Sequence, residues 1–275
     1  MTITNKTARF STAFIAAFFL VFGLSLLHAR ASDAPSAREV MVKVAATRKL
    51  AGSEAVIEMT ILNRKGEART RKIAMATKLF DGGKTEKRIY KFVAPADVKG
   101  TGVLTFDYED KPDDTWIFLP ALRKTRRIVR SQRSKSFMGS EFSYADLNVP
   151  VISDFSYRHI RSESVDGASC WVIEALPTTK KIAASEGYSR KLYWVHRTEF
   201  TIRRAEYYDP KGDLLKELTI TNTRLLDPKN KRYRSMHMEM HNRKNGRRSI
   251  FHSEKLEFAP ATKDEFFTMR YLERP

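Results

Sequence analysis

The chain has 275 residues, a length that suits one large domain or two small ones. Hydrophobic residues make up 42%, including 17 Phe and 10 Tyr, which is enough apolar material for a core and excludes a chain that is disordered throughout. The single cysteine, Cys170, excludes an intramolecular disulfide and any cysteine-rich zinc or iron–sulfur site. The net charge of +18 suits either an anionic partner surface, such as lipid headgroups, or solubility alone.

The first 31 residues have the three parts of a secretory signal. Lys6 and Arg9 precede an uncharged apolar run at 10–27, and the tripeptide Ala-Arg-Ala at 29–31 places small residues at both cleavage positions. We therefore expect cleavage after residue 31 and export to a bacterial periplasm, where nucleic acid is not a partner. The alternative is an uncleaved membrane anchor, because a run of this length nearly spans a bilayer. The removed segment holds three basic residues and no acidic one, so the mature chain would carry +15.

The mature chain, residues 32–275, is predicted to be a single domain that begins with a helix. Residues 37–50 repeat apolar side chains at helical spacing. Ser36 followed three residues later by Glu39 forms a capping box, which marks the start of this helix.

From residue 54 onward the apolar period changes to two, which is typical of strands. Turn sequences such as Asp81-Gly82 and Asn245-Gly246 separate successive segments. The sequence predicts about a dozen strands, at 54–62, 68–80, 84–94, 102–109, 115–119, 124–130, 156–163, 169–176, 188–196, 200–208, 213–224, 232–242 and 247–253. Consecutive hairpins favour an up-and-down antiparallel sheet that curls into a closed or half-open barrel, and such a barrel can enclose a cavity.

Two segments interrupt or end this pattern. Residues 131–154 are polar and small with spaced aromatics, which predicts a long loop with a short helix around 144–147; a loop of this length is more often functional than decorative. The last residues, from about 262, carry Phe266, Phe267 and Leu272 and are predicted to form a short helix that docks on the sheet.

No motif indicates catalysis. The sequence holds no G-x-S-x-G, H-E-x-x-H, P-loop or G-x-G-x-x-G motif in the required setting, so we expect neither an enzyme nor a cofactor. One segment, 236–241, alternates methionine with His, Glu and His. Thioethers suit Cu(I), but methionines at period two equally suit a flexible apolar interior, and we favour that second interpretation over a metal site.

Several strands carry methionine or bulky apolar side chains on the face that alternation assigns to the interior. These side chains form either a dry, packed core or the wall of a cavity for an apolar ligand such as an acyl chain, and both interpretations need the same alternation. The candidates for a cavity wall are Met59, Met75, Leu104, Phe106, Trp116, Phe118, Leu192, Trp194, Leu218, Ile220, Met236, Met238 and Met240.

A basic run without acidic residues extends from Arg123 to Lys135. Within it, Arg126, Arg127 and Arg130 are candidates for contact with anionic headgroups or an acidic partner protein. The alternative is an ordinary solvated surface.

Several segments together resemble the outer-membrane lipoprotein-sorting (LolA-like) proteins of bacteria. The segments that carry the resemblance lie at 99–102, 104–110, 116–122, 126–128 and, most specifically, 137–147, which reads FMGSEFSYADL. The similarity covers about residues 40–275. Glu141 is a mild departure, since the family often has Asp at this place.

The resemblance implies a mainly β fold, an incomplete antiparallel barrel with helices that line or cover an apolar cavity. It also implies that the protein carries a lipoprotein's acyl chains, or another lipid, through the periplasm. A further implication is that it acts together with an inner-membrane transporter of the resistance-nodulation-division (RND) type. A lipid-responsive sensor or interaction module on the same fold is the alternative function.

Overall fold

The structure is a computed structural model that describes residues 1–2, 34–109 and 111–274; the predicted secretory signal therefore lies, apart from its first two residues, outside the described residues. Thirteen β-strands form its sheet. They are β1 (Gly52–Leu62), β2 (Ala68–Phe80), β3 (Thr85–Ala94), β4 (Gly102–Tyr108), β5 (Asp114–Leu119), β6 (Lys124–Ile128), β7 (Phe155–Val165), β8 (Ala168–Pro177), β9 (Arg190–His196), β10 (Ile202–Tyr208), β11 (Leu214–Asp227), β12 (Arg232–Asn242) and β13 (Arg248–Phe258).

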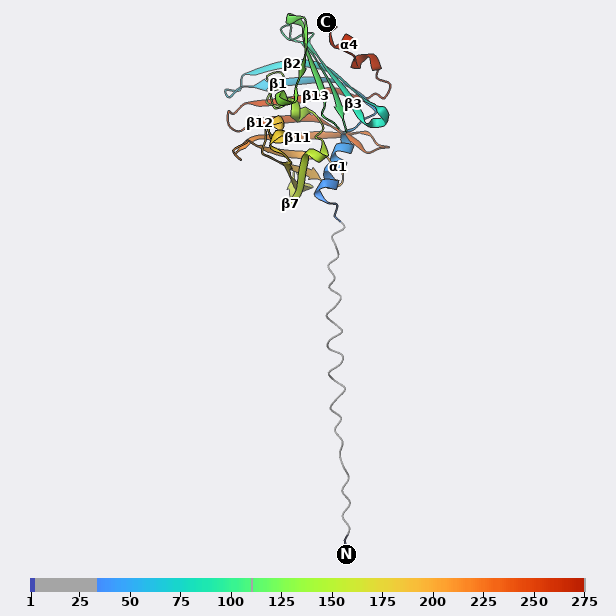
Figure 1. Ribbon diagram of the computed structural model, residues 1–275, viewed down its shortest axis with the longest axis vertical. Helices are drawn as coiled ribbons and strands as arrows, with labels where there is room; N and C mark the ends of the chain where they lie inside the picture. Colours follow the sequence, from blue (N-terminus) through green and yellow to red (C-terminus); the bar gives the residue numbers. More distant parts are fainter. Residues whose placement is uncertain (3–33, 110, 275) are drawn as a thin grey trace. The chain divides into compact units, whose positions relative to one another are not determined.

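All strand pairs are antiparallel, in the order β6-β5-β4-β3-β2-β1-β13-β12-β11-β10-β9-β8-β7 (Figure 1). Strands that follow one another in sequence therefore pair, except for β6 and β7, and β1 also pairs with β13. In the described part of the chain, β6 and β7 are the edges of the sheet and do not pair with each other. The structure confirms the mainly β, up-and-down architecture that the sequence predicts, and the sheet forms a half-open barrel that is not closed.

The sheet curls strongly enough for distant strands to meet across its concave face. Glu86 on β3 and Arg234 on β12 lie 3.6 Å apart, Oε2 to Nη2, although β2, β1 and β13 separate their strands. This contact shows that the inward-facing side chains of the sheet surround a common interior.

Helix α1 (Ala37–Arg48) occupies part of that interior. The predicted capping box is present: Glu39 N–H donates to Ser36 Oγ at 3.2 Å, and Ser36 N–H donates to Glu39 Oε2 at 2.7 Å. The helix buries Val40 and Val44 and contacts β7 and β12. No helix in the described ranges is both long and apolar enough to cross a membrane.

A long connector, residues 129–154, joins the two edge strands across the concave side. It contains helix α2 (Tyr144–Leu147), at the place where a short helix is predicted, and single 3₁₀ turns at Arg130–Gln132 and Ile152–Asp154. Phe137 and Phe142 are 1% and 2% exposed, so the connector supplies core residues and is not a surface loop. A further helix, α3 (Lys180–Glu186), is short and polar, and the hydrophobic pattern does not predict it.

The C-terminal segment docks on the opposite, convex face, as predicted. It consists of the 3₁₀ turn Asp264–Phe267 and helix α4 (Met269–Leu272). Phe267 and Leu272 are buried in an apolar cluster together with Leu104 and Phe118. The approach is close, because a Cβ at Gly102 would lie 2.6 Å from Leu272 Cδ1. Both faces of the sheet therefore carry apolar side chains in this region.

Candidate functional site

A cavity of about 190 Å³ lies between the concave face of the sheet and the two segments that cover it, α1 and the connector. For comparison, an apolar cavity of about 150 Å³ in another protein binds benzene. The space is therefore large enough for one slender apolar segment. Phe142 and Leu147 of the connector and Met41 and Val44 of α1 contribute apolar side chains to the wall.

Three neighbouring strands form the most continuous apolar part of the wall. Strand pairing places Ile220 opposite Met238, and Met238 opposite Phe251; Leu218 lies opposite Met240 in the same way. All five side chains line the cavity, and we call this part the methionine end. Methionine is unbranched and polarisable, so it adapts to ligands of different shape.

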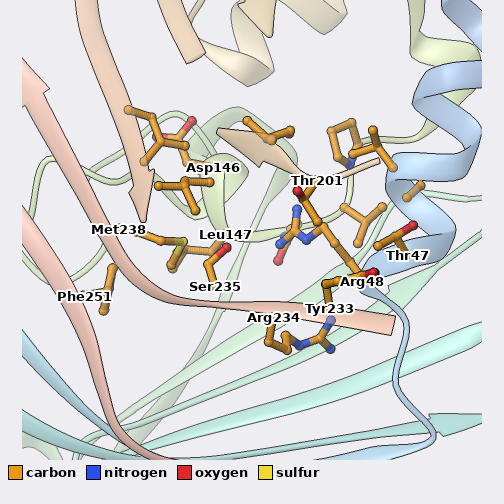
Figure 2. A pocket seen from close by; sticks show the side chains of 18 of the residues that line it. Thr47, Arg48, Asp146, Leu147, Thr201, Tyr233, Arg234, Ser235, Met238 and Phe251 are labelled. Atoms are coloured by element: carbon orange, nitrogen blue, oxygen red, sulfur yellow. The ribbon is translucent and has the colours of Figure 1, made fainter. Parts of the chain in front are cut away.

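The other end of the cavity is charged. Along β12 the inward-facing row changes from Arg234 to methionines, and along β3 it changes from Glu86 and Arg88 to Tyr90. Figure 2 shows Arg48, from the end of α1, and Arg234 on the side of the cavity away from Met238. We call the region lined by Arg48, Arg88 and Arg234 the basic end.

A buried ion cluster organises the basic end. Arg88 Nη2 lies 2.7 Å from Glu86 Oε1 and 3.6 Å from Asp107 Oδ2, and Arg88 also donates to the carbonyl oxygen of Leu147, which ties the connector to β3. Burial opposes the ionisation of Glu86, but Arg88 and Arg234 outweigh it and hold the pKa of Glu86 below its ordinary value. For Asp107 the effect of burial exceeds that of the nearby Arg88 charge and raises the pKa of the carboxyl group to about 6.

Asp107→Asn should therefore become more stable relative to wild type as the pH rises. The pKa of Asp107 is about 6 in the folded chain against an ordinary 3.8, so folding favours the protonated form. Its favourable contribution is complete below about pH 4 and is lost as the pH rises through 6, by up to roughly 3 kcal/mol. Urea unfolding of both proteins at pH 4 and pH 7 measures this difference, and a difference that does not change with pH would contradict it.

Polar contacts hold the connector in the segment that carries the family resemblance. Asp146 accepts a hydrogen bond from Tyr188 Oη at 2.9 Å and lies 3.9 Å from Lys216 Nζ. Glu141 accepts from Asn242 Nδ2 at 2.8 Å and pairs with Arg247 at 3.1 Å. The connector is thus fixed to β11, β12 and the β12–β13 turn, and its motif has a structural role in covering the cavity.

Of the thirteen residues proposed for the cavity wall, the structure places five on it: Met75, Leu218, Ile220, Met238 and Met240. Met59 and Met236 belong to the same buried core but do not line the cavity. The other six lie away from it, which corrects their expected position. They are Leu104, Phe106, Trp116, Phe118, Leu192 and Trp194.

The reason is that apolar side chains occupy both faces of these strands. On β4 and β5, the convex face packs against the C-terminal segment, so Leu104 and Phe118 have their own apolar partners there. On β9, the indole of Trp194 is covered by Arg204 and Arg161, whose guanidinium carbons lie 4.6 and 5.7 Å from the ring centroid. An alternating pattern with two apolar faces does not show which face is concave.

The structure separates the members of the basic run. Arg126 and Arg127 are exposed on edge strand β6, and Arg127 pairs with Asp114 across to β5. Arg130 is half-buried and pairs with Asp154 at 3.2 Å inside the connector. Of the three arginines proposed as a contact surface, Arg126 and Arg127 therefore lie on an open surface and Arg130 does not.

The alternating segment at 236–241 places its methionines toward the interior. Among the described residues, no group of three or more His, Cys, Asp and Glu side chains is arranged to hold a metal ion.

Sequence reasoning missed the residues of the basic end. The predicted elements contain all three residues, Arg48, Arg88 and Arg234. In the alternation of β12, Arg234 falls on the same face as Met236 and Met238, and this charged residue at an inward-facing position was the available signal. That the three arginines lie close together, however, depends on the curl of the sheet.

This chain is similar to one family model and to several solved structures. A family model whose description reads "Uncharacterized protein" matches residues 84–274. A domain described as an outer membrane lipoprotein-sorting protein, from Vibrio parahaemolyticus, is 30% identical, with a TM-score of 0.78 over 86% of this chain and 98% of its own. A DUF1329 family protein from Desulfovibrio piger is 29% identical, with a TM-score of 0.78 over 86% and 97% of the two chains.

A LolA superfamily protein from Nitrosomonas europaea is 22% identical, with a TM-score of 0.63 over 86% of this chain and 100% of its own, a similarity that bears on the fold alone. No curated protein matches the sequence.

Proposed function

Because the chain belongs to the outer-membrane lipoprotein-sorting (LolA-like) family, we propose that it is a periplasmic carrier whose cavity binds the acyl chain of a lipid or lipoprotein. The observation that carries this proposal is the methionine end, a continuous apolar wall from β11, β12 and β13 inside a curled sheet. Exposure of an acyl chain to water costs about 0.8 kcal/mol per CH₂ group, so a carrier must enclose it. The relative from Vibrio parahaemolyticus is described as sorting lipoproteins, which is the same class of cargo.

Native mass spectrometry of protein purified from its own periplasm tests this function directly. We expect a population with an added mass of an acyl-containing molecule, which organic solvent extracts and lipid mass spectrometry identifies. Protein that carries no adduct and also fails to bind an added fluorescent fatty acid would contradict the carrier function.

The protein is expected to reach the periplasm through cleavage of residues 1–31. N-terminal sequencing of the exported protein should start at Ser32, because the small residues at 29 and 31 fit the peptidase site. Membrane-bound protein with an intact Met1 would support an anchor instead.

The exposed arginines of β6 are proposed to contact an anionic surface, either a membrane or an inner-membrane RND-type transporter as the family resemblance implies. Replacing both Arg126 and Arg127 by Ser should weaken binding to anionic liposomes several-fold and leave folding nearly intact, because exposed charges contribute little to stability. Binding of the wild type should also weaken with salt, since the Debye length falls from about 10 Å at 0.1 M to about 3 Å at 1 M. Liposome sedimentation measures both effects, and a double variant that binds like wild type would show these arginines to be ordinary surface.

A further inference from the structure

Three arginines from distant parts of the chain meet at the basic end. Arg48 is the last residue of α1, Arg88 lies on β3 and Arg234 lies on β12, and all three line the cavity that also contains the methionine end. Met240 follows Arg234 by six positions on β12, a distance of roughly 20 Å along an extended strand. One cavity is thus lined by arginines on one side and by methionines on another, and Figure 2 shows Arg48 and Arg234 apart from Met238.

Acidic side chains compensate this positive charge only in part. Glu86 is shared between Arg88, at 2.7 Å, and Arg234, at 3.6 Å. Asp107 lies 3.6 Å from Arg88 and adds a second partner to that residue alone. Arg48 forms no ion pair within 4.0 Å with any residue that the structure describes. Positive charge is therefore in excess at Arg48 and Arg234.

Two further observations agree with this excess. Burial, together with the nearby charges of Arg48 and Arg88, lowers the pKa of Arg234 to about 10 despite the presence of Glu86. The hydroxyl oxygen of Thr223, which also lines the cavity, is buried and has no hydrogen-bond partner among the described residues. An anion at this end would reduce the repulsion between the arginines and could accept a hydrogen bond from this hydroxyl.

We propose that the basic end binds the anionic headgroup, a carboxylate or a phosphate, of the amphiphile whose acyl chain occupies the methionine end. The inference rests on the proposed carrier function and adds a charge requirement for the cargo. Guanidinium groups present paired donors that match both anions, and a partly buried site strengthens the attraction. Arg48 is half-exposed at the end of α1 and has no ion pair to lose, so it is the residue best placed to engage a headgroup.

Three amphiphiles with the same chain test the headgroup site: dodecanoate, dodecyl phosphate and dodecanol. Displacement of the neutral dye N-phenyl-1-naphthylamine from the mature protein reports each affinity. We expect at least one anionic ligand to bind at least tenfold more tightly than dodecanol, and the better anion identifies the headgroup class. Arg48→Ser should remove most of this preference without changing the affinity for dodecanol, and Arg48→Lys should retain part of it.

Arg126→Ser, the same substitution at an exposed arginine on β6, is the matched control and should leave all three affinities unchanged. Equal binding of dodecanol and both anions by the wild type, or an Arg48→Ser variant that loses dodecanol as strongly as the anions, would overturn the headgroup site and leave the carrier function standing. Failure of all three ligands and the dye to bind would instead overturn the carrier function, and the headgroup site with it.

Discussion

Met238→Glu is expected to weaken the binding of a fluorescent fatty acid by at least tenfold, and Phe106→Glu is expected to leave it within twofold of wild type. Met238 lines the cavity between Ile220 and Phe251, so a carboxylate there would face the acyl chain without a partner. An unpaired charge in an apolar site costs several kcal/mol, and each 1.4 kcal/mol is a factor of ten in affinity.

Phe106 makes a demanding control because it is also partly buried and apolar. It lies on the convex face, against Trp116 with ring centroids 5.2 Å apart, and Lys87 Nζ is 4.5 Å from the centroid of its ring. That ammonium group can compensate a glutamate at position 106. Fluorescence titration after a check of folding by circular dichroism measures both variants. Equal losses in the two variants would show that the cavity of this structure is not where the probe binds.

Phe137→Ala is expected to destabilise the fold by about 3–5 kcal/mol, the usual cost of deleting a buried phenyl ring. Phe137 is 1% exposed and is the centre of an aromatic group, with Tyr90 and Tyr144 at 5.5 Å and Phe251 at 6.2 Å between ring centroids. For a domain of this size, the loss corresponds to a fall in Tm of roughly 10 °C.

The same substitution at Phe258 is the control for Phe137, because the Phe258 side chain is 39% exposed at the end of β13. Phe258→Ala should cost less than about 1 kcal/mol. Differential scanning calorimetry of the two variants makes the comparison. A Phe137→Ala protein as stable as Phe258→Ala would mean that the connector is not anchored in the core.

Local sequence patterns determined which elements form and where they end. The alternation at 68–80 and 232–242 coincides with the limits of β2 and β12, and Ser36 with Glu39 marks the start of α1, because hydrogen bonds and side-chain periodicity within a few residues decide these features. The order of hairpins also predicted the up-and-down sheet, since short turns leave neighbouring strands little choice but to pair.

Only the tertiary structure decided which face of each strand is concave and which charges meet there. Leu104 and Val103 are both buried, Leu104 on the convex face under the C-terminal segment, more than 150 residues later in the chain, and Val103 in the core on the concave face. Arg234 reaches Glu86 because the curl brings β12 and β3 together across three intervening strands. Alternation along a strand distinguishes its two faces but does not show which of them faces the interior. The cavity and its basic end therefore arise from long-range packing that local sequence patterns do not predict.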